Sequence, residues 1–398
     1  MNCSNTVKRL PRGGAAFKAA LFALLIVGAA LNAAGDTDWV VLPYASASRR
    51  MLLHALRDSG KPMATDLRLD NVKGKIRSLR IGHNKSGYSF SGINFYGVAA
   101  VVTGGDPCRD KNPKSDRRNY SFGSAINLIL RNCRTAEHGV DMLRDGFKKS
   151  LISGSMIFMI ADARRAFVVE CSPKHFASSE LTNGFCVYAN CWELPNMQDG
   201  SRRSAASRNW YGQRVWTVCE MLRRARTSGN TVSLAESFAA SRIGVAEINA
   251  KIFEKARDKG KISNTPANKY SADGVLFEID GEFPAQLSTA YIAFGPQRHT
   301  VYLPVSLGAA EKLPAELATP NSWKAAALAR LKAAKPETPV DRRLVEFENR
   351  MLENFAKKRE EARKLLRNKN AADAKKLLQE TLEQQITDLN TFLQSLKS

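Results

Sequence analysis

The chain has 398 residues, of which 44% are hydrophobic and 25% are charged, as in a globular protein with a sizeable core. Its formal net charge of +22 favours anionic partners, such as an anionic surface of the cell envelope. The basic residues are scattered and no nucleic-acid-binding motif accompanies them, so the charge does not predict specific binding of DNA or RNA.

The N-terminal segment is typical of a signal peptide. Four basic residues precede an apolar run over residues 19–31, and small residues follow it. Ala33 and Gly35 then stand at positions −3 and −1 of a cut before Asp36. We therefore expect residues 1–35 to be removed on export to the periplasm or the exterior, so that the mature chain begins at or within a few residues of Asp36. The alternative is an uncleaved signal anchor, which the shortness of the apolar run disfavours.

The cysteine count agrees with export. Of the seven cysteines, Cys3 lies in the predicted signal peptide, and the other six are Cys108, Cys133, Cys171, Cys186, Cys191 and Cys219. An even number of cysteines in an oxidising compartment predicts that some of them form disulfide bonds. The alternative is a set of buried thiols. Because no paired C-x-x-C spacing occurs, the sequence predicts neither a metal site nor a cofactor.

Short apolar runs then predict strands, and longer periodic segments predict helices. The first expected strands are 38–44, 50–56, 65–69 and 97–104. One helix is expected from Ser121, and a second begins after Thr135, a suitable N-cap residue. Strands at 155–162, 165–171 and 185–191, helices at 204–226 and 234–242, and strands at 274–280, 288–295 and 300–305 follow. This order predicts an α+β layered sandwich rather than a nucleotide-binding Rossmann fold.

Beyond about residue 318 the composition shifts to alanine, lysine, glutamate and leucine. Apolar residues recur there at steps of three and four, at Leu378, Leu382, Ile386, Leu389, Leu393 and Leu396. This spacing predicts an amphipathic helix within a C-terminal helical extension, residues 318–398. We expect a helical hairpin packed on the main domain, and the alternative is a helix that mediates self-association.

Several segments, in this order, resemble one family. They are GINFYGVAAVVTGG (Gly92–Gly105), SMIFMIADARRAFVVECSP, VYANCWELP, SRRSAASRNW and YIAFGPQRHTVYLP. Together they resemble the linear-amide C–N hydrolases of the N-terminal-nucleophile (Ntn) hydrolase superfamily, which includes choloylglycine hydrolases, penicillin acyltransferase-like hydrolases and secreted dipeptidases. The resemblance covers residues 36–317 and implies a four-layer αββα sandwich.

The resemblance also implies a mechanism and a set of site residues. In this family the side chain of the first mature residue, usually cysteine, attacks an amide carbonyl while its own α-amine takes the proton. Asparagine side chains donate hydrogen bonds to the developing oxyanion. By position, these asparagines correspond to Asn94 and Asn190, the supporting arginine to Arg208, and the aspartate that holds the α-amine or the arginine to Asp58. The implied substrate is a small peptide or an acyl-amide.

The chain departs from the family pattern at the nucleophile. Asp36 stands where the family has cysteine, and Ala55 stands where it has an arginine. A carboxylate that attacks an amide forms an anhydride, which is a poorer acyl carrier than a thioester. Thr37 supplies a hydroxyl nucleophile if the cut falls after Asp36, but a shift of one residue turns a strand side chain to the opposite face.

Two hypotheses therefore stand. The first is an active amide hydrolase or acyltransferase that uses Asp36 or Thr37. The second is a catalytically inactive relative that binds its ligand in the old cleft, and the missing cysteine and arginine favour it.

Overall fold

The computed structural model describes residues 36–59, 65–83, 89–108, 120–197, 200–244, 247, 264–268, 270–318, 321–335 and 338–396. The predicted signal peptide, residues 1–35, lies outside this part of the chain. Among the described residues, no helix combines the length and the hydropathy that a membrane span needs.

A six-stranded antiparallel sheet contains the start of the described chain. Its strand order is β10-β1-β2-β11-β12-β13. The bounds are β1 Thr37–Val41, β2 Met51–Asp58, β10 Phe185–Ala189, β11 Ser271–Ile279, β12 Thr289–Ala293 and β13 Tyr302–Ser306. Because β1 has a hydrogen-bonded neighbour on each side, the first residues of the described chain lie inside the sheet.

A seven-stranded antiparallel sheet faces the first one. Its strands follow each other in chain order as a meander. They are β3 Thr65–Asp70, β4 Ser78–His83, β5 Ser89–Asn94, β6 Ala99–Gly104, β7 Met156–Ala161, β8 Ala166–Cys171 and β9 Phe176–Glu180. The apolar runs did not predict β4, β5 and β9, since none of these strands contains such a run, and β9 is only partly buried.

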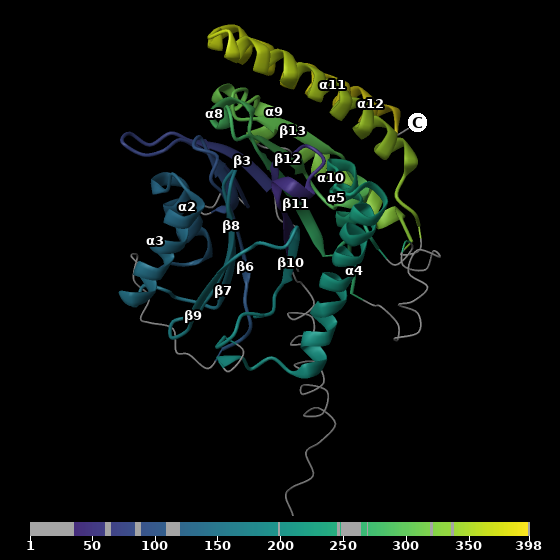
Figure 1. Cartoon of the computed structure of the whole chain (residues 1–398). Coiled ribbons are helices and arrows are strands. Elements are labelled where there is room, and N and C mark those ends of the chain that lie inside the picture. The colour runs from purple at the N-terminus through teal and green to yellow at the C-terminus, as the bar shows by residue number, and fades with distance from the viewer. Residues whose placement is uncertain are drawn as a thin grey trace, which may run out of the picture. The chain divides into compact units, whose positions relative to one another are not determined.

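Helices cover the outer face of each sheet, as Figure 1 shows. Helices α2 (Phe122–Asn132) and α3 (Ala136–Lys148) lie on the seven-stranded sheet, and α4 (Ala205–Gly229) and α5 (Leu234–Ser241) lie on the six-stranded sheet. The predicted N-cap is confirmed, because the Thr135 side chain accepts a hydrogen bond from the backbone N–H of His138.

Three apolar layers hold this arrangement together. Val40 and Leu53 of one sheet share a core with Val101 and Met159 of the other. Two further cores join the seven-stranded sheet to α2 and α3, and the six-stranded sheet to α4 and α5. The fold is therefore the predicted α+β sandwich of four layers, αββα.

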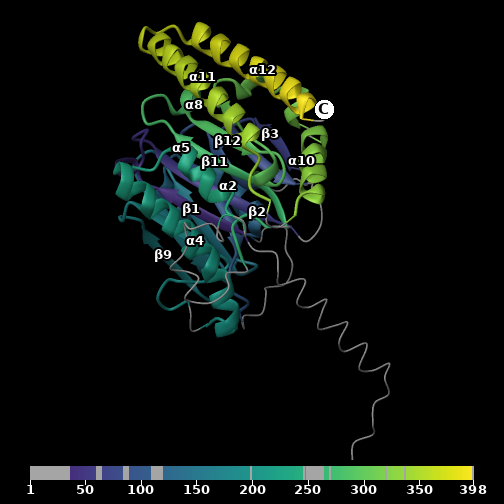
Figure 2. The same ribbon diagram turned by 90° about the vertical axis from the view of Figure 1, so that its right-hand side faces the viewer.

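The C-terminal part is helical, as the sequence predicts. It contains α10 (Asn321–Ala333), α11 (Arg342–Arg367) and α12 (Ala371–Ser395). Helices α11 and α12 lie side by side as a hairpin (Figure 2), and both contact β13. The predicted apolar stripe of α12, including Leu378 and Leu382, is buried in the same core as Leu303. That this extension is a separate domain from residue 318 stays a prediction.

The connections also contain the short helices α8 (Pro284–Leu287) and α9 (Ala315–Ala318), and the 3-10 turns η1 (Pro43–Ala45), η4 (Gln297–His299) and η5 (Ala310–Lys312).

Buried charges anchor α11 to the six-stranded sheet. The Arg359 guanidinium donates to the carboxylate of Glu278, at the end of β11, and Arg363 pairs with Asp280. Near the start of α11, Glu348 accepts two hydrogen bonds from Arg242, at 2.6 and 2.7 Å. These charges are all buried, so each pair depends on both of its members.

Candidate functional site

Asp36 lies directly before β1, where its carboxylate connects the two sheets. The backbone N–H of Asp58, at the end of β2, donates to Oδ1 of Asp36 over 3.0 Å. The hydroxyl of Thr103, on β6 of the opposite sheet, donates to Oδ2 over 2.8 Å. The Arg57 guanidinium lies 3.7 Å from the same oxygen, and the Asp36 side chain is 19% exposed. Both carboxylate oxygens are therefore engaged by the protein itself.

Thr37 faces the opposite side of the sheet from Asp36. Val40 of β1 packs between the sheets, whereas Trp39 and Val41 pack against α4 and α5. Because side chains alternate along a strand, Thr37 shares the face of Trp39. It is fully buried, and its hydroxyl has no hydrogen-bond partner among the described residues. The structure thus separates the two candidate nucleophiles by the thickness of the sheet.

A buried ion pair lies beside Asp36 on the same face. The Arg57 guanidinium donates to Oδ1 of Asp38 over 2.9 Å. Burial raises the pKa of Asp38 to about 7, and the charge of Arg57 only partly offsets this effect. Burial also acts against the charge of Arg57, but the carboxylates of Asp38 and Asp36 outweigh it and raise the pKa of Arg57. Neither Arg57 nor Asp38 was predicted. The resemblance assigned the family's arginine to position 55, which is Ala55.

The raised pKa of Asp38 makes stability depend on pH. Between its ordinary value of 3.8 and about 7, the folded state holds a proton that the unfolded state has lost. The contribution of Asp38 to the free energy of unfolding is therefore fully present below pH 3.8. It declines by up to about 1.4 kcal/mol per pH unit as the pH rises to about 7. We expect Asp38→Asn to remove this decline in urea unfolding measured across that range. Asp141→Asn, at an exposed position on α3, is the matched control and should leave the slope unchanged. Equal slopes in all three proteins would refute the assignment.

Asn190 is brought to Asp36, as the resemblance implies. Its Nδ2 donates to the hydroxyl oxygen of Thr103 over 2.9 Å and to the carbonyl of Gly104 over 3.0 Å. A carbonyl only accepts, so the nitrogen of the amide must face Gly104. Both amide protons are thus in use, and hydrogen bonds run from Asn190 through Thr103 to Asp36. Thr103 was not predicted, although it lies inside the segment that carries the resemblance.

Asn94 does not lie at this site. It follows the last pair of β5 with β6, Ile93 with Ala99, whereas Thr103 lies at the other end of β6. Its Nδ2 donates to the carbonyls of Leu130 and Cys133 in the segment that ends α2. Its Oδ1 accepts from the backbone N–H groups of residues 96 and 98. Asn94 therefore holds the turn between β5 and β6 against α2 and is not available to an oxyanion.

Arg208 lies one step further from Asp36. Its guanidinium donates to Oδ2 of Asp106 over 2.7 Å and to the carbonyl of Trp192 over 3.2 Å. Arg203 binds the same carboxylate and donates to the backbone carbonyl of Asn190 over 2.6 Å. Asp106 is fully buried, whereas Arg208 keeps 28% of its side chain exposed. Arg208 thus reaches the site through this cluster.

Asp58 supports the site from the helical side of the sheet. Its carboxylate accepts from Arg214 on α4 over 2.8 Å and from Asn268 over 2.8 Å. The side chains of Asp58 and Arg214 are both 0% exposed. The arginine partner of Asp58 is therefore Arg214 and not Arg208. The backbone N–H of Asp58, in contrast, donates to Asp36.

The predicted disulfide bonds do not form. Among the described residues, no disulfide bond is formed by Cys133, Cys171, Cys186, Cys191 or Cys219. Cys186 contacts the core between the sheets, whereas Cys191 packs with Tyr211. Burial raises the pKa of Cys186 to about 11 and that of Cys191 to about 12, so neither is an activated nucleophile. The described residues also contain no group of three or more metal-ligating side chains.

A serine–histidine pair lies on the other face of the six-stranded sheet. Nδ1 of His54 is 3.2 Å from the hydroxyl of Ser237, and Nε2 is 3.0 Å from the hydroxyl of Tyr302. All three residues are fully buried, and burial lowers the pKa of His54 well below its usual value. This neutral network joins β2 to α5 and β13, and no substrate reaches it.

Comparison with known proteins gives likenesses of structure alone. No protein-family model and no curated protein sequence matches the chain. Among solved structures it is similar to the Caenorhabditis elegans ortholog of N-acylethanolamine-hydrolyzing acid amidase, with 11% identity over 61% of this chain and 92% of that chain, and a TM-score of 0.38. The penicillin V acylase from Agrobacterium tumefaciens gives 14% identity over 68% of this chain and 86% of that chain, with a TM-score of 0.37. A variant of the conjugated bile acid hydrolase from Clostridium perfringens gives 8% identity over 68% of this chain and 92% of that chain, with a TM-score of 0.43. These values are low, so the function has to be inferred from the geometry of the chain itself.

Proposed function

We propose that this chain is an exported Ntn-hydrolase-like protein that binds a small peptide or acyl-amide without cleaving it. The observation that carries the proposal is the run of hydrogen bonds from Asn190 through Thr103 to Asp36. At the position of the nucleophile stands a carboxylate whose two oxygens are bound by the protein. That arrangement suits a group that joins two sheets rather than one that attacks a substrate.

The hydrogen-bond donors of the candidate site are already engaged, which supports the inactive form. A tetrahedral intermediate needs preorganised donors that point at its oxyanion. Both amide protons of Asn190 are donated to acceptors within the site. Both amide protons of Asn94 are donated to backbone carbonyls near the other end of β6. Thr37, the other candidate nucleophile, is buried under the helical layer. An active enzyme would have to break these bonds at every turnover.

A partly exposed cation supports ligand binding at the same place. Arg208 keeps 28% of its side chain exposed beside the Asn190 network, and its orientation is fixed by Asp106. A guanidinium in this position is able to donate to the carbonyl or carboxylate of a peptide or acyl-amide. Export, which we propose from residues 1–35, would bring the protein into contact with such ligands outside the cytoplasm.

The test uses the processed chain with Asp36 as its first residue. We expect calorimetric titration with dipeptides, N-acyl amino acids and penicillin V to give saturable binding to at least one of them, with no release of amine above a protein-free control. Arg208→Gln should weaken that binding about tenfold, the loss of one charge-assisted hydrogen bond. Arg223→Gln, at an exposed position on the same helix, is the matched control. Amine release that Thr37→Ala abolishes would instead establish an active hydrolase, and absence of binding to the whole panel would overturn the binding role.

A further inference from the structure

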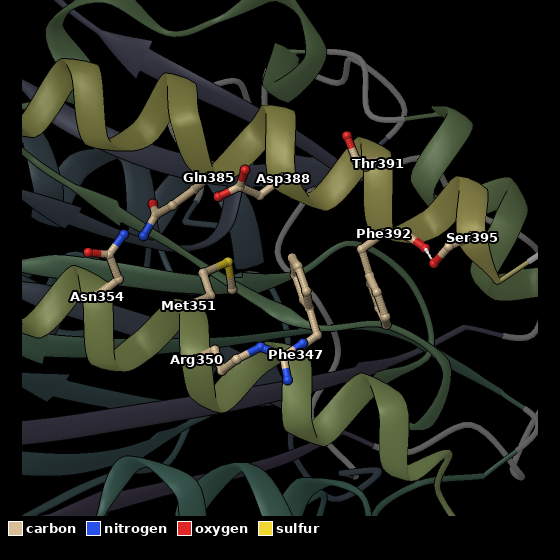
Figure 3. Close-up of a pocket in the computed structure, with 9 residues that line it drawn as sticks. All are labelled: Phe347, Arg350, Met351, Asn354, Gln385, Asp388, Thr391, Phe392 and Ser395. Atoms are coloured by element: carbon tan, nitrogen blue, oxygen red, sulfur yellow. Dashed lines mark hydrogen bonds between the residues drawn. The ribbon is translucent and has the colours of Figure 1, made fainter.

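A groove lies between the two C-terminal helices, on elements that do not contribute to the Asp36 site. It is a hollow of about 380 Å³, within the size range of small-ligand sites. Residues of α11 line one side and residues of α12 line the other, and Figure 3 shows Met351, Phe347, Gln385 and Phe392 directed into the space between the helices.

One buried side chain in this groove lacks the hydrogen bonds that it needs. Gln385, on α12, is 2% exposed, yet its Oε1 and its Nε2 are buried without a partner among the described residues. It points across the groove toward Asn354 and Met351 of α11 (Figure 3). Each unsatisfied polar group costs about 1–3 kcal/mol. Elsewhere on α12, by contrast, the amide of Gln379 donates to the carbonyl of Lys312.

The rest of the groove supplies an apolar end and a charged rim. Phe347 of α11 and Phe392 of α12 stack with their ring centroids 4.2 Å apart and their planes at 4°. Arg350 is exposed on the α11 side and forms no salt bridge with the described residues, and Asp388 is exposed on the α12 side. An apolar surface, an unsatisfied amide and two opposite charges therefore line one hollow.

An extended peptide satisfies the amide better than other ligands of this size. A carboxamide presents one donor and one acceptor side by side. One residue of an extended peptide presents its own N–H and C=O toward the same side, as in an antiparallel strand pair, so both atoms of Gln385 are satisfied together. An isolated hydroxyl or carboxylate satisfies only one of the two atoms well.

We propose that this groove binds a short extended peptide with a free C-terminus. One residue of the peptide exchanges two hydrogen bonds with Gln385, and an apolar side chain lies against Phe347 and Phe392. The terminal carboxylate meets Arg350, and the terminal ammonium meets Asp388. This site is distinct from the Asp36 site and does not depend on the function proposed for that site.

The test is a calorimetric titration of the processed full chain with the tripeptide alanyl-alanyl-phenylalanine. We expect saturable binding that Gln385→Leu weakens at least tenfold, while the urea midpoint of the variant stays equal to or above that of wild type, since the substitution removes a buried unsatisfied amide. Gln394→Leu, at an exposed position on the same helix, should leave the affinity unchanged. Arg350→Gln should weaken binding of the free acid but not of the tripeptide amide.

Three outcomes would overturn the proposal. The first is no saturable binding to wild type, which would assign the Gln385 amide to water. The second is equal affinity in wild type and Gln385→Leu. The third is loss of the binding in Asn190→Ala with no effect of Gln385→Leu, which would place the tripeptide at the Asp36 site.

Discussion

Arg214→Met should lower the free energy of unfolding by about 3–5 kcal/mol, as removal of one partner from a buried ion pair does. The Arg214 guanidinium donates to Asp58 over 2.8 Å, and both side chains are 0% exposed. It also donates to the carbonyl of Pro266 over 3.2 Å. Without Arg214, the Asp58 carboxylate stays buried between the six-stranded sheet and α4, where the amide of Asn268 still donates to it.

Urea unfolding at neutral pH measures this loss. Arg223→Met, at an exposed position on the same helix, is the matched control, and its effect should stay within about 0.5 kcal/mol. The double variant Asp58→Asn, Arg214→Met should recover part of the loss, because it removes the unpaired charge. If Arg214→Met costs no more than the control, the pair does not hold β2 to α4.

Arg359→Met should cost about 3–5 kcal/mol by the same mechanism and should also change the response to acid. Burial alone would raise the pKa of Glu278, but the charges of Arg359 and Arg50 outweigh burial and lower this pKa from 4.5 to about 2. The pKa of Glu278 is thus lower in the folded state than in the unfolded state. Its contribution to the free energy of unfolding is therefore present above pH 4.5 and is lost as the pH falls toward about 2. In Arg359→Met the pKa of Glu278 should rise, and the loss should begin at higher pH.

Thermal unfolding followed between pH 2 and pH 7 tests both parts of this prediction, over the window set by the Glu278 pKa. Lys357→Met, at an exposed position on α11, is the control and should leave the acid limb of the curve in place. Because Arg359 anchors α11, limited proteolysis should cut the C-terminal hairpin of Arg359→Met sooner than that of the control. Identical acid limbs in the two variants would contradict the assignment to Glu278.

Much of the layer order could be predicted from the sequence. Apolar runs with turn residues between them located β1, β2, β7 and β8, because buried strands need such runs. The alternation of a strand also predicts that Asp36 and Thr37 face opposite sides, and the packing of Val40 and Trp39 agrees with this. The helix N-cap at Thr135 could also be predicted, because its hydrogen bond depends only on neighbouring residues in the chain.

The rest of the site depends on contacts between distant segments. Arg208 and Arg214 lie less than two turns apart on α4, and only the rotation of that helix against the sheet decides which of them meets Asp58. Asn94 stands in a G-x-N segment, but sequence does not reveal at which end of β6 it lies. The disulfide prediction was wrong because pairing requires two cysteines within a few ångströms, which an even count does not provide.

The substitution Asp36→Ala tests most directly whether Asp36 is a structural carboxylate. It should be made in processed chain whose intact mass confirms Asp36, or its replacement, as the first residue. We predict no amide hydrolysis by either protein and a loss of about 1–3 kcal/mol of stability in the variant, because the Thr103 hydroxyl and the Asp58 N–H lose their acceptor. Amide hydrolysis by wild type that disappears in Asp36→Ala, with the stability of the fold unchanged, would contradict it.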